Sequence, residues 1–151
     1  MQQYTVCFFG HRKLQDMKRI DDSLPQLIEE LVHTKPFVEF LIGRNGEFDE
    51  YVASLIKSVQ KKADIQNSSL TLVLPYTVVD ISYFELYYDD IIIPDTAQNV
   101  HHKRAITIRN QWMIQHSDLV IVNVDHPSGG AYSALRYAEL LKKNLINSFF
   151  Y

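Results

Sequence analysis

Short apolar runs recur along the chain, each bounded by turn residues or by a polar segment. Runs that are rich in β-branched and aromatic residues, without regular polar alternation, are typical of strands buried on both faces of a sheet. Five segments have this pattern: Tyr4–Phe9, Phe37–Ile42, Leu70–Leu74, Leu119–Val124 and Leu145–Phe149. We therefore predict a strand over each of them.

Apolar residues at helical spacing lie between the predicted strands. Three stripes are visible: Ile20, Leu24, Leu27, Ile28, Leu31 and Val32; Phe48, Val52, Leu55, Ile56 and Val59; and Ala131, Ala134, Leu135, Ala138 and Leu141. A fourth helix is expected from Lys103 to His116, and Ser23 with Gln26 is expected to form a capping box, with Pro25 in the first turn. Strands that alternate with helices predict parallel βαβ units. The expected fold is α/β, a Rossmann-like open, mostly parallel sheet with helices on both faces.

Residues 76–100 depart from this alternation. They include four tyrosines, Phe84 and several carboxylates, and they are too numerous for an ordinary connection. We expect an irregular lid or insertion, an extra hairpin, or a contact between two copies of the chain in a homodimer. The whole chain, residues 1–151, is otherwise expected to form a single domain.

Composition excludes several function classes. Lys and Arg number 15 against 18 Asp and Glu, a net charge of −3, which argues against membrane binding and against nucleic acid as a partner. The lone cysteine, Cys7, excludes a disulfide framework, and no apolar run is long enough to span a membrane. Met1 is followed almost at once by a strand-like run rather than by a signal peptide, so we expect a cytoplasmic protein.

All five glycines follow predicted strands. Gly10 follows the first, Gly43 and Gly46 follow the second, and Gly129 and Gly130 follow the strand over Leu119–Val124. Glycine is common at such turns for conformational reasons alone. In open α/β sheets, however, this edge is also where ligands bind and where helix N-termini present free N–H groups. The clustering of every glycine there favours a site for an anionic ligand.

Four motifs in order resemble the small bacterial and phage proteins of the SLOG superfamily. They are Gly10-His11-Arg12; Gly43-Arg44-Asn45-Gly46-Glu47-Phe48-Asp49; Arg109-Asn110 with Met113-Ile114 and Ser117-Asp118; and Gly129-Gly130-Ala131. The resemblance runs from Thr5 to about Asn147. SLOG proteins are Rossmann-like domains related to the LOG phosphoribohydrolases and to the core of DprA, so the resemblance implies binding of a nucleotide or a nucleotide-derived ligand.

Residues from these motifs and their neighbours are the candidate ligand-binding residues: Gly10, His11, Arg12, Gly43, Arg44, Asn45, Gly46, Asp49, Arg109, Asn110, Ser128, Gly129 and Gly130. Ser128 can cap the last helix and leave N–H groups free for phosphate oxygens. Arg109 can clamp a phosphate or stack on a base, or it is a surface arginine paired with an acid. Asp49 can bind a ribose hydroxyl, or it merely favours the positive end of its helix.

The resemblance does not extend to the catalytic residue of the LOG enzymes. Their proline-glycine-glycine-x-glycine-threonine-x-x-glutamate motif places a glutamate where this chain has Arg136. A carboxylate stabilises the oxocarbenium-like transition state of N-glycoside cleavage, and an arginine opposes it. A hydrolase would have to use Asp49, Glu47 or Asp125 instead, and no catalytic residue is assigned.

We therefore expect a sensor or binding domain for a nucleotide-like small molecule, without a cofactor. The alternative is a nucleotide N-glycosidase or phosphoribohydrolase-like hydrolase. DprA-like binding of single strands is disfavoured by the net charge and by the lack of a basic groove with interleaved aromatic residues. No metal is expected, because His101-His102 has no third ligand at a suitable spacing.

Overall fold

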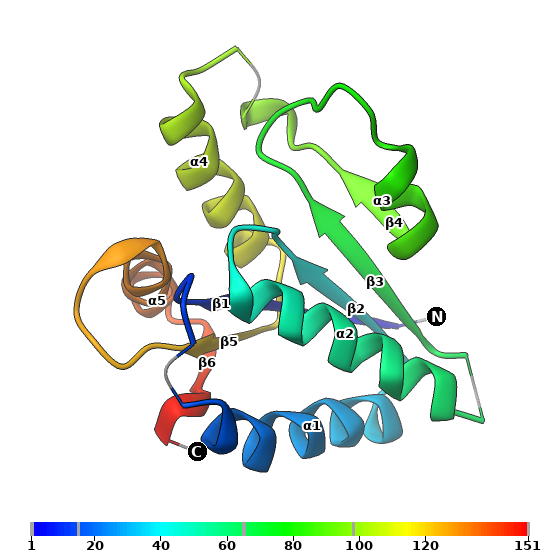
Figure 1. Cartoon of the computed structure of the whole chain (residues 1–151). Coiled ribbons are helices and arrows are strands. Elements are labelled where there is room, and N and C mark those ends of the chain that lie inside the picture. The colour runs from blue at the N-terminus through cyan, green and yellow to red at the C-terminus, as the bar shows by residue number, and fades with distance from the viewer. Residues whose placement is uncertain (1, 15, 65, 98, 151) are drawn as a thin grey trace.

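Six parallel strands form one open sheet in the order β4-β3-β2-β1-β5-β6 (Figure 1). The computed structural model describes residues 2–14, 16–64, 66–97 and 99–150. The strands are β1 (Gln3–Gly10), β2 (Phe37–Ile42), β3 (Ser68–Val73), β4 (Asp90–Ile92), β5 (Leu119–Asn123) and β6 (Asn144–Asn147). The helices are α1 (Met17–Thr34), α2 (Glu47–Lys62), α3 (Ser82–Tyr87), α4 (His102–Gln115) and α5 (Gly129–Leu140), with 3₁₀ turns η1 (Asp95–Ala97) and η2 (Ser148–Phe150). The predicted Rossmann-like α/β fold is confirmed.

Helices cover both faces of the sheet. Alternate residues of β1 point to opposite sides: Val6 and Phe8 pack with α1 and α2, whereas Cys7 and Phe9 pack with α4 and α5. The helical stripes predicted in α1 and α2 supply the larger core, in which Ile20 and Phe48 are almost completely buried. Because the central strands are covered on both sides, their sequences read as continuous apolar runs.

The strand order places a topological switch beside β1. The chain first builds β1 to β4 outward toward one edge, and it then returns so that β5 pairs with the other side of β1. The loops that follow β1 and β5 therefore leave in opposite directions. In this class of sheet the resulting crevice, at the carboxyl ends of the strands, is where ligands bind.

The start of α1 differs from the prediction. Asp16 is the N-cap, and its side chain accepts a hydrogen bond from the Arg19 N–H at 3.2 Å. Ser23 lies inside the helix and donates to the carbonyl oxygen of Arg19, so the predicted capping box is wrong. Pro25 is also internal.

Residues 76–100 are more regular than predicted. They hold α3, the short edge strand β4 and η1, and β4 pairs in parallel with β3 from Thr71↔Asp90 to Val73↔Ile92. This part therefore extends the sheet by one strand, whereas the expectation of a lid, an insertion or a contact between copies stays a prediction; Gln98 lies outside the described residues. No described helix is both long enough and apolar enough to cross a membrane.

Candidate functional site

A cavity of about 340 Å³ lies at the carboxyl edge of the sheet, among the loops that follow β1, β2 and β5. We call it the edge cleft. Its volume lies within the range of about 300–1,000 Å³ that is usual for small-molecule sites. The lining residues are Phe8, Phe9, Gly10, His11, Arg12, Gly43, Asn45, Asp49, Ile106, Arg109, Asn110, Met113, Gly129, Gly130 and Ala131. Most of the predicted ligand-binding residues therefore come together in one place.

Arg109 supplies a buried positive charge to this cleft. It lies on α4, and only 1% of its surface is exposed. Its Nη1 donates to the carbonyl oxygen of Val73 at 2.8 Å, and its Nε donates to Oδ1 of Asn110 at 2.8 Å. Burial lowers the pKa of the guanidinium, and the nearby Asp49 carboxyl opposes this effect. The expectation of a surface arginine paired with an acid does not describe this residue.

Asp49 lies in the first turn of α2 and faces the same cleft. Its Oδ2 accepts a hydrogen bond from the Asn45 N–H at 3.0 Å, which closes the loop between β2 and the helix. Burial raises the pKa of this carboxyl to about 6, although the Asn45 N–H and the charge of Arg109 act in the opposite direction. Near neutral pH, Asp49 can therefore donate or accept a proton, or bind a hydroxyl group.

The loop that follows β1 is fixed across the start of α2. The N–H of Glu47 donates to the carbonyl oxygen of Arg12 at 2.8 Å, and Oε1 of Glu47 accepts from the Leu14 N–H. A Cβ at Gly46 would lie 2.5 Å from the Arg12 α-carbon, so only glycine permits this crossing. Gly46 does not line the cleft, but it allows the loop after β1 to take its place beside the cleft.

The N-terminus of α5 opens onto the cleft. Gly129 has φ +90°, a conformation that favours glycine, and a Cβ at either Gly129 or Gly130 would meet nothing within 4 Å. Ser128 is the N-cap, but its side chain makes no capping hydrogen bond, contrary to the prediction. The extended backbone of Ser128 directs the chain into the helix, and the N–H groups of the first turn have no acceptor among the described residues.

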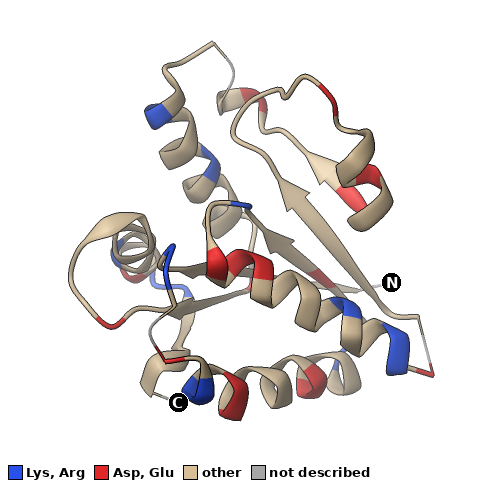
Figure 2. Cartoon of the chain, in the orientation of Figure 1, with Lys and Arg blue, Asp and Glu red and all other residues tan. Residues whose placement is uncertain are grey.

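Arg44 lies outside the edge cleft. Its guanidinium packs over the ring of Phe84 at 5.0 Å and lines a separate cavity with the tyrosines of α3. Figure 2 shows basic residues on the loops after β1 and β2, and acidic residues in the first turn of α2. The edge of the sheet therefore carries both signs of charge.

Arg136 lies on the surface of α5 and outside the edge cleft. Its side chain is 65% exposed, its Nε lies 3.4 Å from Glu139 Oε1, and its Nη1 donates to the Tyr132 hydroxyl. It is not among the residues that line the cleft.

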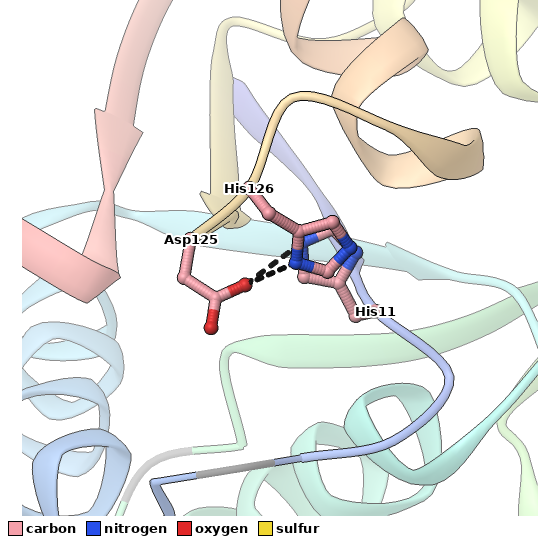
Figure 3. Close-up of side chains that lie close together, drawn as sticks. All are labelled: His11, Asp125 and His126. Atoms are coloured by element: carbon pink, nitrogen blue, oxygen red, sulfur yellow. Dashed lines mark hydrogen bonds and ion pairs between the residues drawn. The ribbon is translucent and has the colours of Figure 1, made fainter.

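A cluster of ionisable residues at the mouth of the cleft was not predicted. His11 from the loop after β1 meets Asp125 and His126 from the loop after β5 (Figure 3). The signal was present in the sequence: Asp125-His126 follows a predicted strand whose carboxyl end lies at the same edge as His11. Only pairing β1 with β5 brings them together.

Comparison with known proteins shows that this chain has a fold similar to those of two solved structures. No family model matches the chain, and no curated protein matches it. Two solved structures of DNA processing protein A (DprA) are similar. The chain from Streptococcus pneumoniae has a TM-score of 0.63 at 13% identity, and the matched region covers 94% of this chain and 49% of that one. The Helicobacter pylori chain has a TM-score of 0.66 at 18% identity, and the matched region covers 94% of this chain and 63% of that one. Its structure describes a unique single-stranded DNA binding mode. The chain thus spans about half to two-thirds of these proteins and shares their Rossmann-like domain.

The expectation that nucleic acid is not a partner has to be corrected. The Helicobacter pylori protein has the same fold and binds single-stranded DNA. Net charge was a poor basis for the exclusion, because a few local groups at a cleft can bind a phosphate whatever the total charge of the chain.

Proposed function

We propose that the edge cleft binds a nucleotide or a nucleotide-derived small molecule through its phosphate. The observation that carries the proposal is the burial of Arg109 beneath the cleft. The hydrogen bonds that it makes among the described residues use Nε and Nη1, so its Nη2 is left for a ligand in the cleft, and a buried guanidinium is stabilised when its donors are paired. A phosphate oxygen would complete those hydrogen bonds in the two-pronged geometry that arginine favours.

The N-terminus of α5 supports the same assignment from the other side of the cavity. Gly129 and Gly130 line the cleft with Arg109, and the helix dipole adds a partial positive charge there. A phosphate between these groups would meet one full charge and several backbone donors. Four other cavities among the described residues lack this combination of a buried cation and a helix N-terminus.

The remaining walls suit a nucleoside. Asp49 and Asn110 offer polar atoms for sugar hydroxyls, and the apolar side chains of Ile106, Met113 and Phe9 offer a surface for a base. The mixture of a few polar groups with an apolar wall is what a nucleotide requires.

The test is calorimetric titration of the purified chain with nucleoside monophosphates, dinucleotides and cyclic nucleotides, and with the matching nucleosides and inorganic phosphate. We expect some phosphorylated ligand to bind at least tenfold more tightly than its nucleoside, and Arg109→Gln to abolish this preference. Arg104→Gln, an exposed arginine on the same helix, is the matched control. Equal binding of nucleotides and nucleosides, or an unchanged preference in Arg109→Gln, would refute the proposal.

A short single-stranded oligonucleotide belongs in the same titration, because the Helicobacter pylori protein, which has a similar fold, binds single-stranded DNA. If mononucleotides fail and the oligonucleotide binds in an Arg109-dependent manner, the ligand is a nucleotide unit of a strand. The role of Arg109 would stand, and the small-molecule part of the proposal would be wrong.

Hydrolysis is the second candidate, and Asp49 is the observation that favours it. A carboxyl with a pKa of about 6 beside the phosphate site could assist departure of a base. The assay follows release of free base and of phosphate from a nucleotide panel. Rapid release that is lost in Asp49→Asn and retained in Arg136→Ala would make the chain a hydrolase. Absence of release with tight binding would make it a binding domain.

A further inference from the structure

Two histidines share one carboxylate oxygen at the mouth of the edge cleft. Oδ1 of Asp125 lies 2.6 Å from Nδ1 of His126 and 3.3 Å from Nε2 of His11 (Figure 3). The two imidazole rings stack with centroids 3.7 Å apart and planes inclined by 13°. One ligand atom from each of the three residues lies within 4.8 Å of the others.

The His11 side chain is left without a proper partner. Its Nε2 is buried, yet it makes no hydrogen bond, because its approach to Asp125 lacks the required geometry. Buried polar atoms in native proteins are nearly always paired with protein, water or an ion. His11 is only 13% exposed, so bulk water does not readily supply that partner.

We propose that His11, Asp125 and His126 bind a divalent transition-metal ion of the zinc and cobalt class. Two imidazole nitrogens and one carboxylate oxygen form a donor set that suits ions of this class. Mg²⁺ and Ca²⁺ suit it less well, because they prefer oxygen ligands alone. Three protein ligands leave at least one coordination position open for another ligand. The proposal does not rest on the proposed function, since the ion alone is the ligand.

The three side chains can bind an ion after only small movements of their ligand atoms. Zinc–nitrogen and zinc–oxygen bonds of about 2.0–2.2 Å place tetrahedral ligand atoms roughly 3.3–3.6 Å apart. The separation of 3.3 Å between His11 and Asp125 already matches, and the direct contact of 2.6 Å between Asp125 and His126 must open by less than about 1 Å. His126 is 46% exposed and can turn its ring out of the stack to aim a nitrogen at the ion.

The surroundings of His11 also favour metal binding. Burial and the neighbouring His126 lower the pKa of His11, and Asp125 opposes this only in part. A lowered pKa favours the neutral imidazole, which is the form that coordinates a metal ion. The carboxylate of Asp125 supplies the negative charge that partly balances the ion.

The experiment is titration of the untagged chain, freed of metal by a chelator, with Co²⁺ and then with Zn²⁺. We expect one equivalent of Co²⁺ to give visible absorption bands that Zn²⁺ abolishes. His126→Asn and Asp125→Asn should each weaken Co²⁺ binding by at least about tenfold, with thermal unfolding used to confirm that the variants fold. His33→Asn removes an exposed histidine from α1 and should leave binding unchanged.

Two results would overturn the proposal. One is wild-type affinity for Co²⁺ that is no higher than that of a His11→Asn/His126→Asn double variant that folds. The other is loss of the absorption bands in His33→Asn with retention in His126→Asn, which would move the metal to the surface of α1.

Discussion

The guanidinium of Arg109 lies directly against the α-carbon of Gly43. A Cβ at this glycine would stand 3.0 Å from Nη1 and 3.2 Å from Cζ of the arginine. The glycine at the end of β2 therefore makes room for a charged side chain from α4, on the other side of the sheet edge. This contact fixes the position of the cation beneath the edge cleft.

Gly43→Ala should accordingly impair ligand binding more than folding. The added methyl group must displace the guanidinium by a few tenths of an ångström, and charge-assisted hydrogen bonds weaken when they are misaligned. We expect the affinity for a nucleotide to fall by about threefold to tenfold, with the free energy of unfolding changed by less than about 1 kcal/mol. Calorimetry and urea unfolding measure the two effects. Unaltered affinity would show that the ligand does not depend on the position of Arg109.

Gly10→Ala should affect folding instead. A Cβ at Gly10 would lie 2.1 Å from Cγ of Phe48, which is completely buried in the larger core. Overpacking of this kind costs about 1–3 kcal/mol in the free energy of unfolding. Gly130→Ala is the matched control, because its Cβ meets nothing within 4 Å and should cost less than about 0.5 kcal/mol. Equal stabilities of the two variants in urea unfolding would contradict the close packing of α2 on β1.

The central strands of the sheet can be predicted from the sequence because they are long apolar runs, but the edge strand β4 cannot. The strand β4 has only three residues, Asp90–Ile92, and the apolar run Ile91–Ile93 is too short to predict a strand by itself. The start of α1 was missed for a related reason. Two residues of a type that can cap a helix lie near the start of the apolar stripe, Asp16 before Ile20 and Ser23 after it. The spacing of the stripe does not say how far upstream the helix extends.

The location of the site can be predicted from the sequence, but the roles of its individual residues are much harder to predict. Glycines that follow strands indicate the edge where ligands bind, but the sequence does not distinguish Gly10, which is needed for packing, from Gly130, which faces open space. The burial of Arg109 depends on how α4 packs, and α4 has no clear apolar stripe. The pairing of His11 with Asp125 and His126 depends on β5 returning beside β1, a long-range contact with no local signal.

The titration of Asp49 makes stability depend on pH in a defined direction. The pKa of Asp49 is about 6 in the folded chain, above the ordinary value of 3.8, so the folded state binds the proton more tightly than the unfolded state. Its contribution to stability is complete below about pH 3.8 and is lost as the pH rises through 6. Asp49→Asn removes this loss while keeping an acceptor for the Asn45 N–H. Relative to the wild type, the variant should gain about 1–3 kcal/mol in the free energy of unfolding between pH 4 and pH 7.

Urea unfolding of both proteins at several pH values measures this difference directly. All other carboxyl groups titrate equally in the two proteins, so they cancel in the comparison. A difference that stays constant from pH 4 to pH 7 would mean that Asp49 has an ordinary pKa, and the case for Asp49 as a proton donor near neutral pH would fail with it.

The N-terminus of α5 can be tested with two substitutions at one position. Gly130→Pro removes the backbone N–H of a residue that lines the cleft, whereas Gly130→Ala keeps it. Proline is tolerated in the first turn of a helix, because the N–H groups there have no partner within the helix, and neither side chain meets a neighbour within 4 Å of the Cβ position. Both variants should therefore unfold within about 1 kcal/mol of the wild type.

Their affinities for a nucleotide should differ. A hydrogen bond to a charged group contributes about 1.5–3 kcal/mol, so Gly130→Pro should bind roughly 10- to 150-fold more weakly than Gly130→Ala. Calorimetry at matched ionic strength measures the ratio, and the nucleoside without its phosphate should bind the two variants equally. If proline and alanine bind the nucleotide equally well, the phosphate does not lie at the start of α5, and Arg109 must hold it elsewhere in the cleft.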